Sequence, residues 1–203
     1  MPLFKISRET YINQYIRLLI MNALSIAGII VGVFVLFVIF LYNGLIRLKN
    51  NIENSLSQID VQLKRRNDLI PNLVETVKGY MKHEKTLLEN ITKARTSIMN
   101  AKSLEAKSKA SNMLSDTLKS LFAVSENYPN LKANENFLQL QEELTGTENK
   151  IAYSRQHYND MVMAFNNKLQ TFPNNIFAKW LNFTKQPLFQ AAEAERKNVK
   201  VQF

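Results

Sequence analysis

The sequence predicts an all-α protein, in which an N-terminal transmembrane helix leads into an antiparallel up-and-down bundle of three long helices plus a short C-terminal helix. Three observations predict this class: a long uncharged apolar stretch, apolar residues at helical spacing through most of the remaining chain, and only five Gly and five Pro in 203 residues. No run with period-two alternation is long enough for a sheet. We divide the chain into a juxtamembrane segment (1–17), a transmembrane helix (18–42), a helical bundle (43–172) and an aromatic short helix with a C-terminal tail (173–203).

The apolar stretch "LLIMNALSIAGIIVGVFVLFVIFLY" runs from Leu18 to Tyr42 without a charged residue. Its length exceeds the ~20 residues that cross a hydrocarbon core of ~30 Å. It is too long and too uniformly apolar for a buried core helix, and "FLYNGLIRL" follows it instead of a small-residue cleavage site. We therefore expect a permanent single-pass anchor in a bacterial-type cell membrane. Basic residues flank both ends, so the positive-inside rule does not assign the side of the soluble part.

The sequence "GIIVG" from Gly28 to Gly32 places two glycines four residues apart on one face of this span. Such spacing permits close backbone contact between spans, which would support a homo-oligomer. The alternative is that the glycines only ease packing against lipid.

Three apolar stripes at helical spacing predict the bundle helices. The first is predicted to continue to Met99, the second to begin after Ser103 as N-cap and to stop before Pro129, and the third to run from the cap Asn134 to Phe172. The third stripe has nearly heptad spacing, and its single glycine, Gly146, predicts a close helix contact. The first stripe comprises Ile52, Leu56, Ile59, Leu63, Ile70, Val74, Val77, Met81, Leu88 and Ile91.

Pro71 lies inside the first of these helices. It has no backbone N–H and its ring crowds the carbonyl of Asn67, so we expect a kink there or a restart capped by Asp68. One interpretation is that the kink only directs packing. The other is that freed carbonyls and the neighbouring polar residues form a surface for a partner or for lipid; its basic members are Lys64, Arg65 and Arg66.

The net charge of +9, with a pI near 9.7, is compatible with an anionic membrane surface. Nucleic-acid binding is not expected, because basic residues are interleaved with acidic ones along the helices. The chain has no cysteine, which excludes disulfides, thiolate metal sites and cysteine nucleophiles.

Residues suited to catalysis form no recognisable motif. His83 and His157 are far apart and lack metal-ligand spacing. Glu142, Glu143 and Glu148 are candidate paired carboxylates, but the Glu-x-x-His pattern of di-iron bundles is missing. We therefore predict no catalytic activity, no metal and no cofactor.

The region after the third helix is rich in aromatic residues, and Phe177, Trp180 and Leu181 are its candidate contact residues. They are predicted to form a lid on the bundle or a subunit contact. A contact with the membrane interface is the alternative, given the nearby Lys179 and Lys185. An antiparallel bundle of three helices would place this region far from the bilayer, which favours the lid or a neighbouring subunit.

Two long segments, "NSLSQIDVQLKRRNDLIPNLVETVKGYMKHE" and "YPNLKANENFLQLQEELTGTENKIAYSRQHYND", resemble conserved blocks of the LemA family of bacterial membrane proteins. The terminal "FP" with its short aromatic helix is also similar, so the resemblance extends over almost the whole chain from Asn43. It implies an N-terminal anchor followed by a helical bundle, and it implies no established reaction.

Two functions fit these features. The first is a membrane-anchored structural, scaffold or adaptor protein that holds protein partners or assembles with its own copies on the bilayer. The second is a sensory or ligand-binding bundle that signals through its single span to a separate partner.

Overall fold

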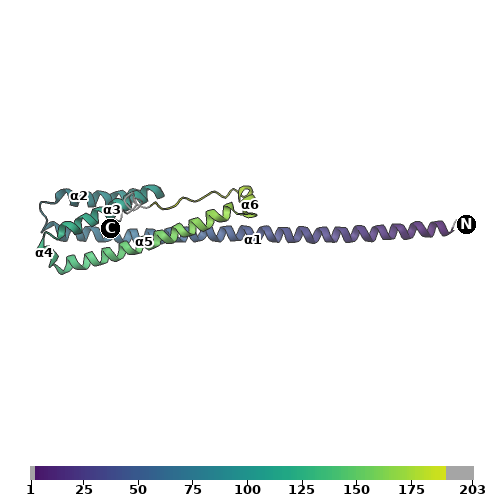
Figure 1. The fold of residues 1–203 in the computed structure, drawn as a ribbon, viewed down its shortest axis with the longest axis horizontal. Coiled ribbons are helices and arrows are strands. Elements are labelled where there is room, and N and C mark those ends of the chain that lie inside the picture. Colours follow the sequence, from purple (N-terminus) through teal and green to yellow (C-terminus); the bar gives the residue numbers. More distant parts are fainter. Residues whose placement is uncertain (1–2, 191–203) are drawn as a thin grey trace, which may run out of the picture.

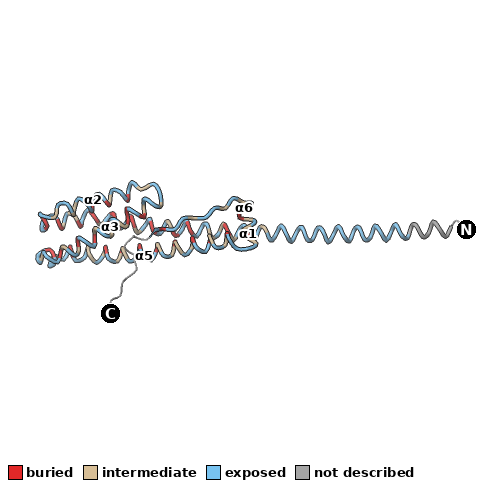
Figure 2. The backbone as a smooth tube through the Cα atoms, turned by 45° about the horizontal axis from the view of Figure 1, so that its top comes forward, coloured by how far each residue is buried: buried red, intermediate tan, exposed pale blue. Residues whose placement is uncertain are grey.

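The first helix, α1, is the longest element of the protein. In the computed structural model, which describes residues 3–190, α1 runs without interruption over the 76 residues Leu3–Lys78. Most of its N-terminal half extends beyond all other elements (Figure 1), and its described residues there are exposed around the helix (Figure 2). Within α1 lies a segment long and apolar enough to cross a membrane, by length and composition. A helix segment that is apolar on every side needs an apolar surrounding, and residues 3–190 do not cover this one.

The end of α1 differs from the sequence prediction. The helix stops at Lys78, a turn follows, and α2 occupies Lys85–Asn100, so the predicted continuation to Met99 is wrong. The prediction ran on because apolar residues keep their helical spacing across the turn. Met81, in the turn itself, and Ile91, in α2, are both buried in the same core. A basic Lys78 followed by Gly79 was a local stop signal.

The two long helices α3 and α5 begin at the predicted caps. In front of α3 (Leu104–Ser125), Ser103 Oγ accepts a hydrogen bond of 3.1 Å from the N–H of Ala106. In front of α5 (Glu135–Gln170), Asn134 Oδ1 accepts one of 3.0 Å from the N–H of Phe137. A single turn, α4 (Pro129–Lys132), joins these two helices, and the predicted short C-terminal helix is α6 (Asn174–Trp180).

The helices form an elongated antiparallel bundle, which confirms the predicted all-α class. From the end of the bundle distant from the N-terminus, α5 returns along α1, while the shorter pair α2 and α3 packs beside the distal part (Figure 1). Consequently α6 lies where α1 leaves the bundle. Among residues 3–190 no strand occurs.

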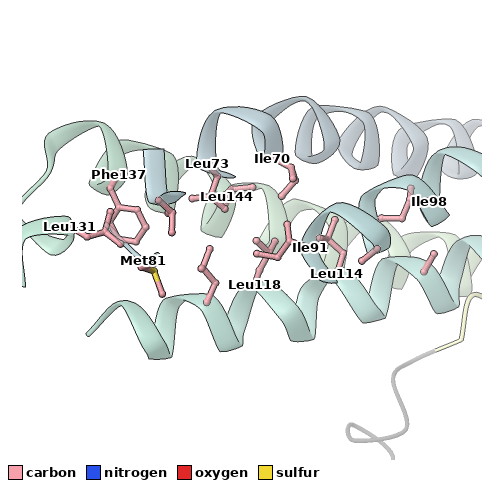
Figure 3. Packing of buried hydrophobic residues seen from close by; sticks show 14 residues of the cluster. Ile70, Leu73, Met81, Ile91, Ile98, Leu114, Leu118, Leu131, Phe137 and Leu144 are labelled. Carbon is pink, nitrogen blue, oxygen red and sulfur yellow. The ribbon is translucent and has the colours of Figure 1, made fainter. Parts of the chain in front are cut away.

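Two separate groups of buried apolar side chains hold the bundle together. The distal core joins α1, α2, α3, α4 and α5 and includes Leu73, Met81, Leu118 and Phe137 (Figure 3). The proximal core joins α1, α5, α6 and the segment after α6; it comprises Leu45, Ile52, Ile59, Leu63, Ile151, Tyr158, Val162, Phe165, Leu169, Ala178 and Phe189.

The close helix contact predicted at Gly146 is wrong. A Cβ atom built on this glycine meets nothing within 4 Å, so no neighbouring backbone requires the missing side chain. Gly146 is half-buried, while its neighbour Thr147 is buried and points into the bundle.

Candidate functional site

A buried polar layer separates the distal core from the proximal core. On α1, Arg66 lies between Leu63 of the proximal core and Ile70 of the distal core. On α5, Glu148 lies between the corresponding pair, Leu144 and Ile151. The Arg66 side chain is fully buried, and such burial of an arginine requires nearly all of its charge to be compensated by partners.

Partners from two other helices surround the Arg66 guanidinium. Its Nη1 forms an ion pair with Glu148 Oε1 and donates a hydrogen bond of 2.9 Å to Ser115 Oγ. Its Nη2 donates to Ser111 Oγ at 2.7 Å. Ser115 Oγ in turn donates to Glu148 Oε2 at 2.8 Å, so α1, α3 and α5 share one network. A second arginine, Arg155 of α5, donates to Ser111 Oγ and, at 2.9 Å, to Asn112 Oδ1. We call Arg66, Ser111, Ser115, Glu148 and Arg155 the arginine layer.

The predicted basic surface of Lys64, Arg65 and Arg66 is therefore wrong for one of its three members. Lys64 is exposed, and Arg65 forms a half-exposed ion pair with Glu143 at 2.6 Å. Arg66 points into the bundle because it falls on the buried stripe between Leu63 and Ile70, at the spacing of three and four residues that a core position shows. That spacing was a readable signal of burial.

Pro71 does not restart the helix, since α1 continues through it; the predicted restart at Asp68 is wrong. Proline cannot donate to the carbonyl of Asn67, four residues earlier. Arg95 of α2 takes this role: its Nε donates to Asn67 O at 3.0 Å. The proline thus opens a backbone acceptor that a second helix uses, and the freed carbonyl contributes to packing between α1 and α2.

The chain after α6 forms an extended segment, residues 184–190, which we call the strap. A left-handed residue, Asn182 with φ of 57°, closes α6, with Phe183 N–H bonded to Ala178 O at 2.9 Å and Asn182 N–H to Lys179 O at 3.2 Å. This bonding is the Schellman arrangement, in which asparagine tolerates the left-handed position. It redirects the chain back along the bundle, and the coloured coil that leaves α6 toward α3 shows this path (Figure 1).

Two asparagines of α5 hold the strap by the same two-bond contact. Asn166 accepts from the N–H of Gln186 at 2.9 Å and donates to its carbonyl at 2.9 Å. Asn159 accepts from the N–H of Phe189 at 2.8 Å and donates to its carbonyl at 3.1 Å. The side-chain amides therefore replace the partner strand that an extended backbone would otherwise need.

Further contacts fix the end of the strap between α5 and α3. Tyr158 OH donates to Pro187 O at 2.9 Å, and Ser108 Oγ of α3 donates to Gln190 O at 2.8 Å. The Phe189 ring is buried, with the Arg155 guanidinium 4.7 Å from its centroid. Through Arg155 the strap is joined to the arginine layer.

The structure places the aromatic α6 at the opposite end of the bundle from the one predicted. Phe177 packs on Phe34 and Phe37 of α1, with 6.2 Å between ring centroids in each pair. The prediction that α6 lies far from the apolar segment is wrong, because the first predicted helix was in fact two helices and α5 consequently returns toward the N-terminal half of α1. Trp180 is exposed and Leu181 is half-buried, and of the three candidate residues Phe177 is the one whose ring packs on aromatic rings of α1.

Gly28 and Gly32 lie on the exposed part of α1. A Cβ atom at either position would meet nothing within 4 Å, so no part of the described chain covers this face. The structure does not bring the glycines together with any other candidate residue.

The pKa values of two tyrosines, Tyr158 and Tyr128, are raised. Burial raises the pKa of Tyr158, whose hydroxyl lies under the strap. Burial, and then the Glu84 carboxylate that accepts its hydroxyl hydrogen bond, raise the pKa of Tyr128. His83 is exposed and His157 is half-buried, and the part of the chain that is described holds no group of three metal-ligating side chains.

These features define a class: a helical bundle with an internal arginine layer, carried on an exposed apolar N-terminal helix. The sequence profile of the LemA family matches residues 55–203, and the chain belongs to this family. It is 31% identical over 174 residues to Protein LemA of Metamycoplasma hominis, an alignment that covers 83% of this chain and 78% of that protein.

Proposed function

We propose that this protein is a membrane-anchored scaffold or adaptor, in which residues 18–42 cross a bacterial-type cell membrane once and the bundle holds protein partners or further copies of the chain. The observation that carries the proposal is the exposure of apolar side chains on every side of α1 before the bundle begins. Phe40 is 76% exposed and Leu24 is 67% exposed, which is untenable in water for so long a helix but normal in lipid.

The proposed role requires no reaction. In the arginine layer, guanidinium, carboxylate and hydroxyl groups bond to one another across three helices, while Arg66 Nε is buried without a hydrogen-bond partner among residues 3–190. Such a layer fixes the register of the helices rather than presenting a reactive group. The proposal therefore includes no catalytic activity.

Membrane insertion is tested by reconstituting the full chain in lipid vesicles and washing them with high salt and with alkaline carbonate. We expect the protein to remain with floating vesicles after both washes, as a spanning helix does. Release by either wash would overturn the anchor.

Self-assembly is tested by measuring the mass of the full chain in mild detergent or nanodiscs by light scattering. We expect a discrete oligomer that the double substitution Gly28→Leu with Gly32→Leu dissociates, because the leucines would separate backbones in contact. Ile26→Leu with Ile30→Leu is the matched control on another part of the same segment and should leave the mass unchanged. An unchanged mass in the glycine variant would remove the span from the assembly mechanism.

A second candidate function, a sensor that signals through the span, is favoured by one observation: α1 is a single helix from the apolar segment to the arginine layer. The chain has no cysteine, so spin labels can be placed specifically at Lys64→Cys on α1 and Lys109→Cys on α3, both exposed. A sensor requires two arrangements of the bundle and so two distance populations between the labels. A single narrow distribution of distances between the labels would favour the scaffold.

A further inference from the structure

The aromatic α6 has one covered face and one open face. On its covered face Asn174 and Ala178 are buried and Phe177 contacts α1. On its open side three large apolar residues occur at intervals of four: Phe172, just before the helix, is 80% exposed, Ile176 is 57% exposed and Trp180 is 71% exposed. Ile176 and Trp180 are four residues apart and therefore share one face of α6. We call these two residues and the exposed Phe172, just before the helix, the apolar edge.

The position of α6 along α1 indicates what covers this edge. Phe177 contacts Phe34 and Phe37, and Phe183 lies 6.1 Å from Tyr42 between ring centroids. Phe34 precedes Tyr42, the last residue of the apolar segment, by about 12 Å along the helix axis. α6 is therefore beside the final two turns of the segment that we propose to span the membrane, which is the depth of the boundary between acyl chains and headgroups.

The charge around α6 fits the same boundary. Residues 161–190 contain Lys168, Lys179 and Lys185 but no Asp or Glu, and Arg47 and Lys49 follow the apolar segment on α1. Lys179 and Lys185 are exposed, with stems long enough to place the ammonium among headgroups while the aromatic edge lies deeper. A basic collar without acids suits a surface that carries anionic lipid.

We propose that α6 is a second membrane contact of this protein: the edge formed by Phe172, Ile176 and Trp180 inserts into the interface of the bilayer that the span crosses. This inference rests on the proposed membrane anchor. It adds a specific role for α6, which attaches the base of the bundle to lipid and restrains its rotation about the span.

Trp180 makes the proposal directly measurable, because it is the one tryptophan in the chain. The full chain is reconstituted in vesicles of phosphatidylcholine and phosphatidylglycerol, with and without phosphatidylcholine brominated near the top of its acyl chains. We expect emission that is blue-shifted from that of tryptophan in water, and a loss of about twofold in intensity with the brominated lipid, since an interfacial ring lies ~5–10 Å into this boundary. Emission at the position of exposed tryptophan, unaffected by bromine, would overturn the proposal.

A variant separates insertion of α6 from anchoring by the span. Phe172→Ser with Ile176→Ser keeps the fluorophore but removes the rest of the apolar edge, and we expect most of the bromine quenching to disappear. The matched control is Leu138→Ser at the far end of α5, where the side chain is 47% exposed, and quenching should persist there. Equal quenching in both variants would contradict the proposed edge.

Three other outcomes distinguish the alternatives. A blue-shifted emission that bromine does not quench, and that reverts when the protein is diluted into excess lipid, would replace the bilayer with a second copy of the chain as the occupant. Loss of the protein from vesicles in a carbonate wash would overturn the anchor itself. Retention in the wash without quenching of Trp180 would overturn only the role of α6.

Discussion

The Nε atom of Arg95 lies 3.0 Å from the carbonyl oxygen of Asn67, the acceptor that Pro71 deprives of its helical donor. The bond joins α2 to α1 at a point where an ordinary residue would have closed the hydrogen bond within α1. Pro71 itself is exposed, so its side chain contributes little to the core. Its effect is to make a backbone group available to a neighbouring helix.

We predict that Arg95 and Pro71 are energetically coupled. Arg95→Met should lower the free energy of unfolding by about 1–2 kcal/mol, because the buried carbonyl of Asn67 loses its donor. In the Pro71→Ala background the same change should cost less, since the alanine N–H can bond to Asn67 O within α1. The measurement is a double-mutant cycle by chemical unfolding of the full chain in detergent, followed by circular dichroism. Strictly additive effects would show that the two residues act independently.

We predict that the adjacent arginines of α1 differ sharply in their effect on stability. Arg66→Met should cost about 3 kcal/mol and lower the melting temperature by roughly 6–12 °C, because Glu148, Ser111 and Ser115 lose their common partner. Glu148 is 29% exposed, so water reaches part of the carboxylate and limits the loss. Thermal unfolding of the full chain in detergent provides the comparison.

Arg65→Met is the matched control for this experiment. The ion pair between Arg65 and Glu143 is 48% and 42% exposed, so its removal should change stability by less than about 1 kcal/mol. Similar losses of stability in Arg66→Met and Arg65→Met would mean that the arginine layer stabilises the fold no more than an exposed ion pair does.

We predict that the asparagine contacts of α5 hold the strap. Asn159→Ala and Asn166→Ala each remove two hydrogen bonds to the extended backbone, so amide exchange at Phe189 and Gln186 should accelerate about tenfold or more. Asn167→Ala, which alters an exposed neighbour of Asn166, should leave exchange unchanged. If all three variants exchange at the same rate, the strap is held by Phe189 and Tyr158 instead.

We predict a loss of stability at alkaline pH that depends on Tyr158. Burial raises the pKa of Tyr158 above its ordinary value of 10.0, so above that pH the unfolded chain releases a proton that the folded chain retains. The contribution of this tyrosine is complete below about pH 10 and is lost as the pH rises through the raised value. Tyr158→Phe should flatten the alkaline decline relative to Tyr153→Phe, a control at a side chain that is 74% exposed. Parallel declines in the two variants would contradict the assignment.

Local signals in the sequence identified the helix starts, since Ser103 and Asn134 both cap as their positions predict. The apolar spacing did not locate the end of α1, because Met81 continues that spacing inside the turn that reverses the chain. The local signals also missed the arginine layer: the spacing of Arg66 on the apolar stripe indicates burial, but nothing in the sequence pairs it with its partners on α3 and α5. The strap has no periodic signal at all, since side chains of α5 supply its hydrogen bonds.

Because α1 is unbroken, the inclination of its apolar part and that of the bundle are one quantity. The stretch from Asn43 to Lys78 rises about 54 Å, so a helix inclined by ~20° to the bilayer normal carries its far end about 18 Å sideways. A thinner bilayer, which favours a larger inclination, would therefore bring the distal core nearer the headgroups. With the proposed anchor in place, the thickness of the surrounding lipid would set how far the distal core stands from the membrane.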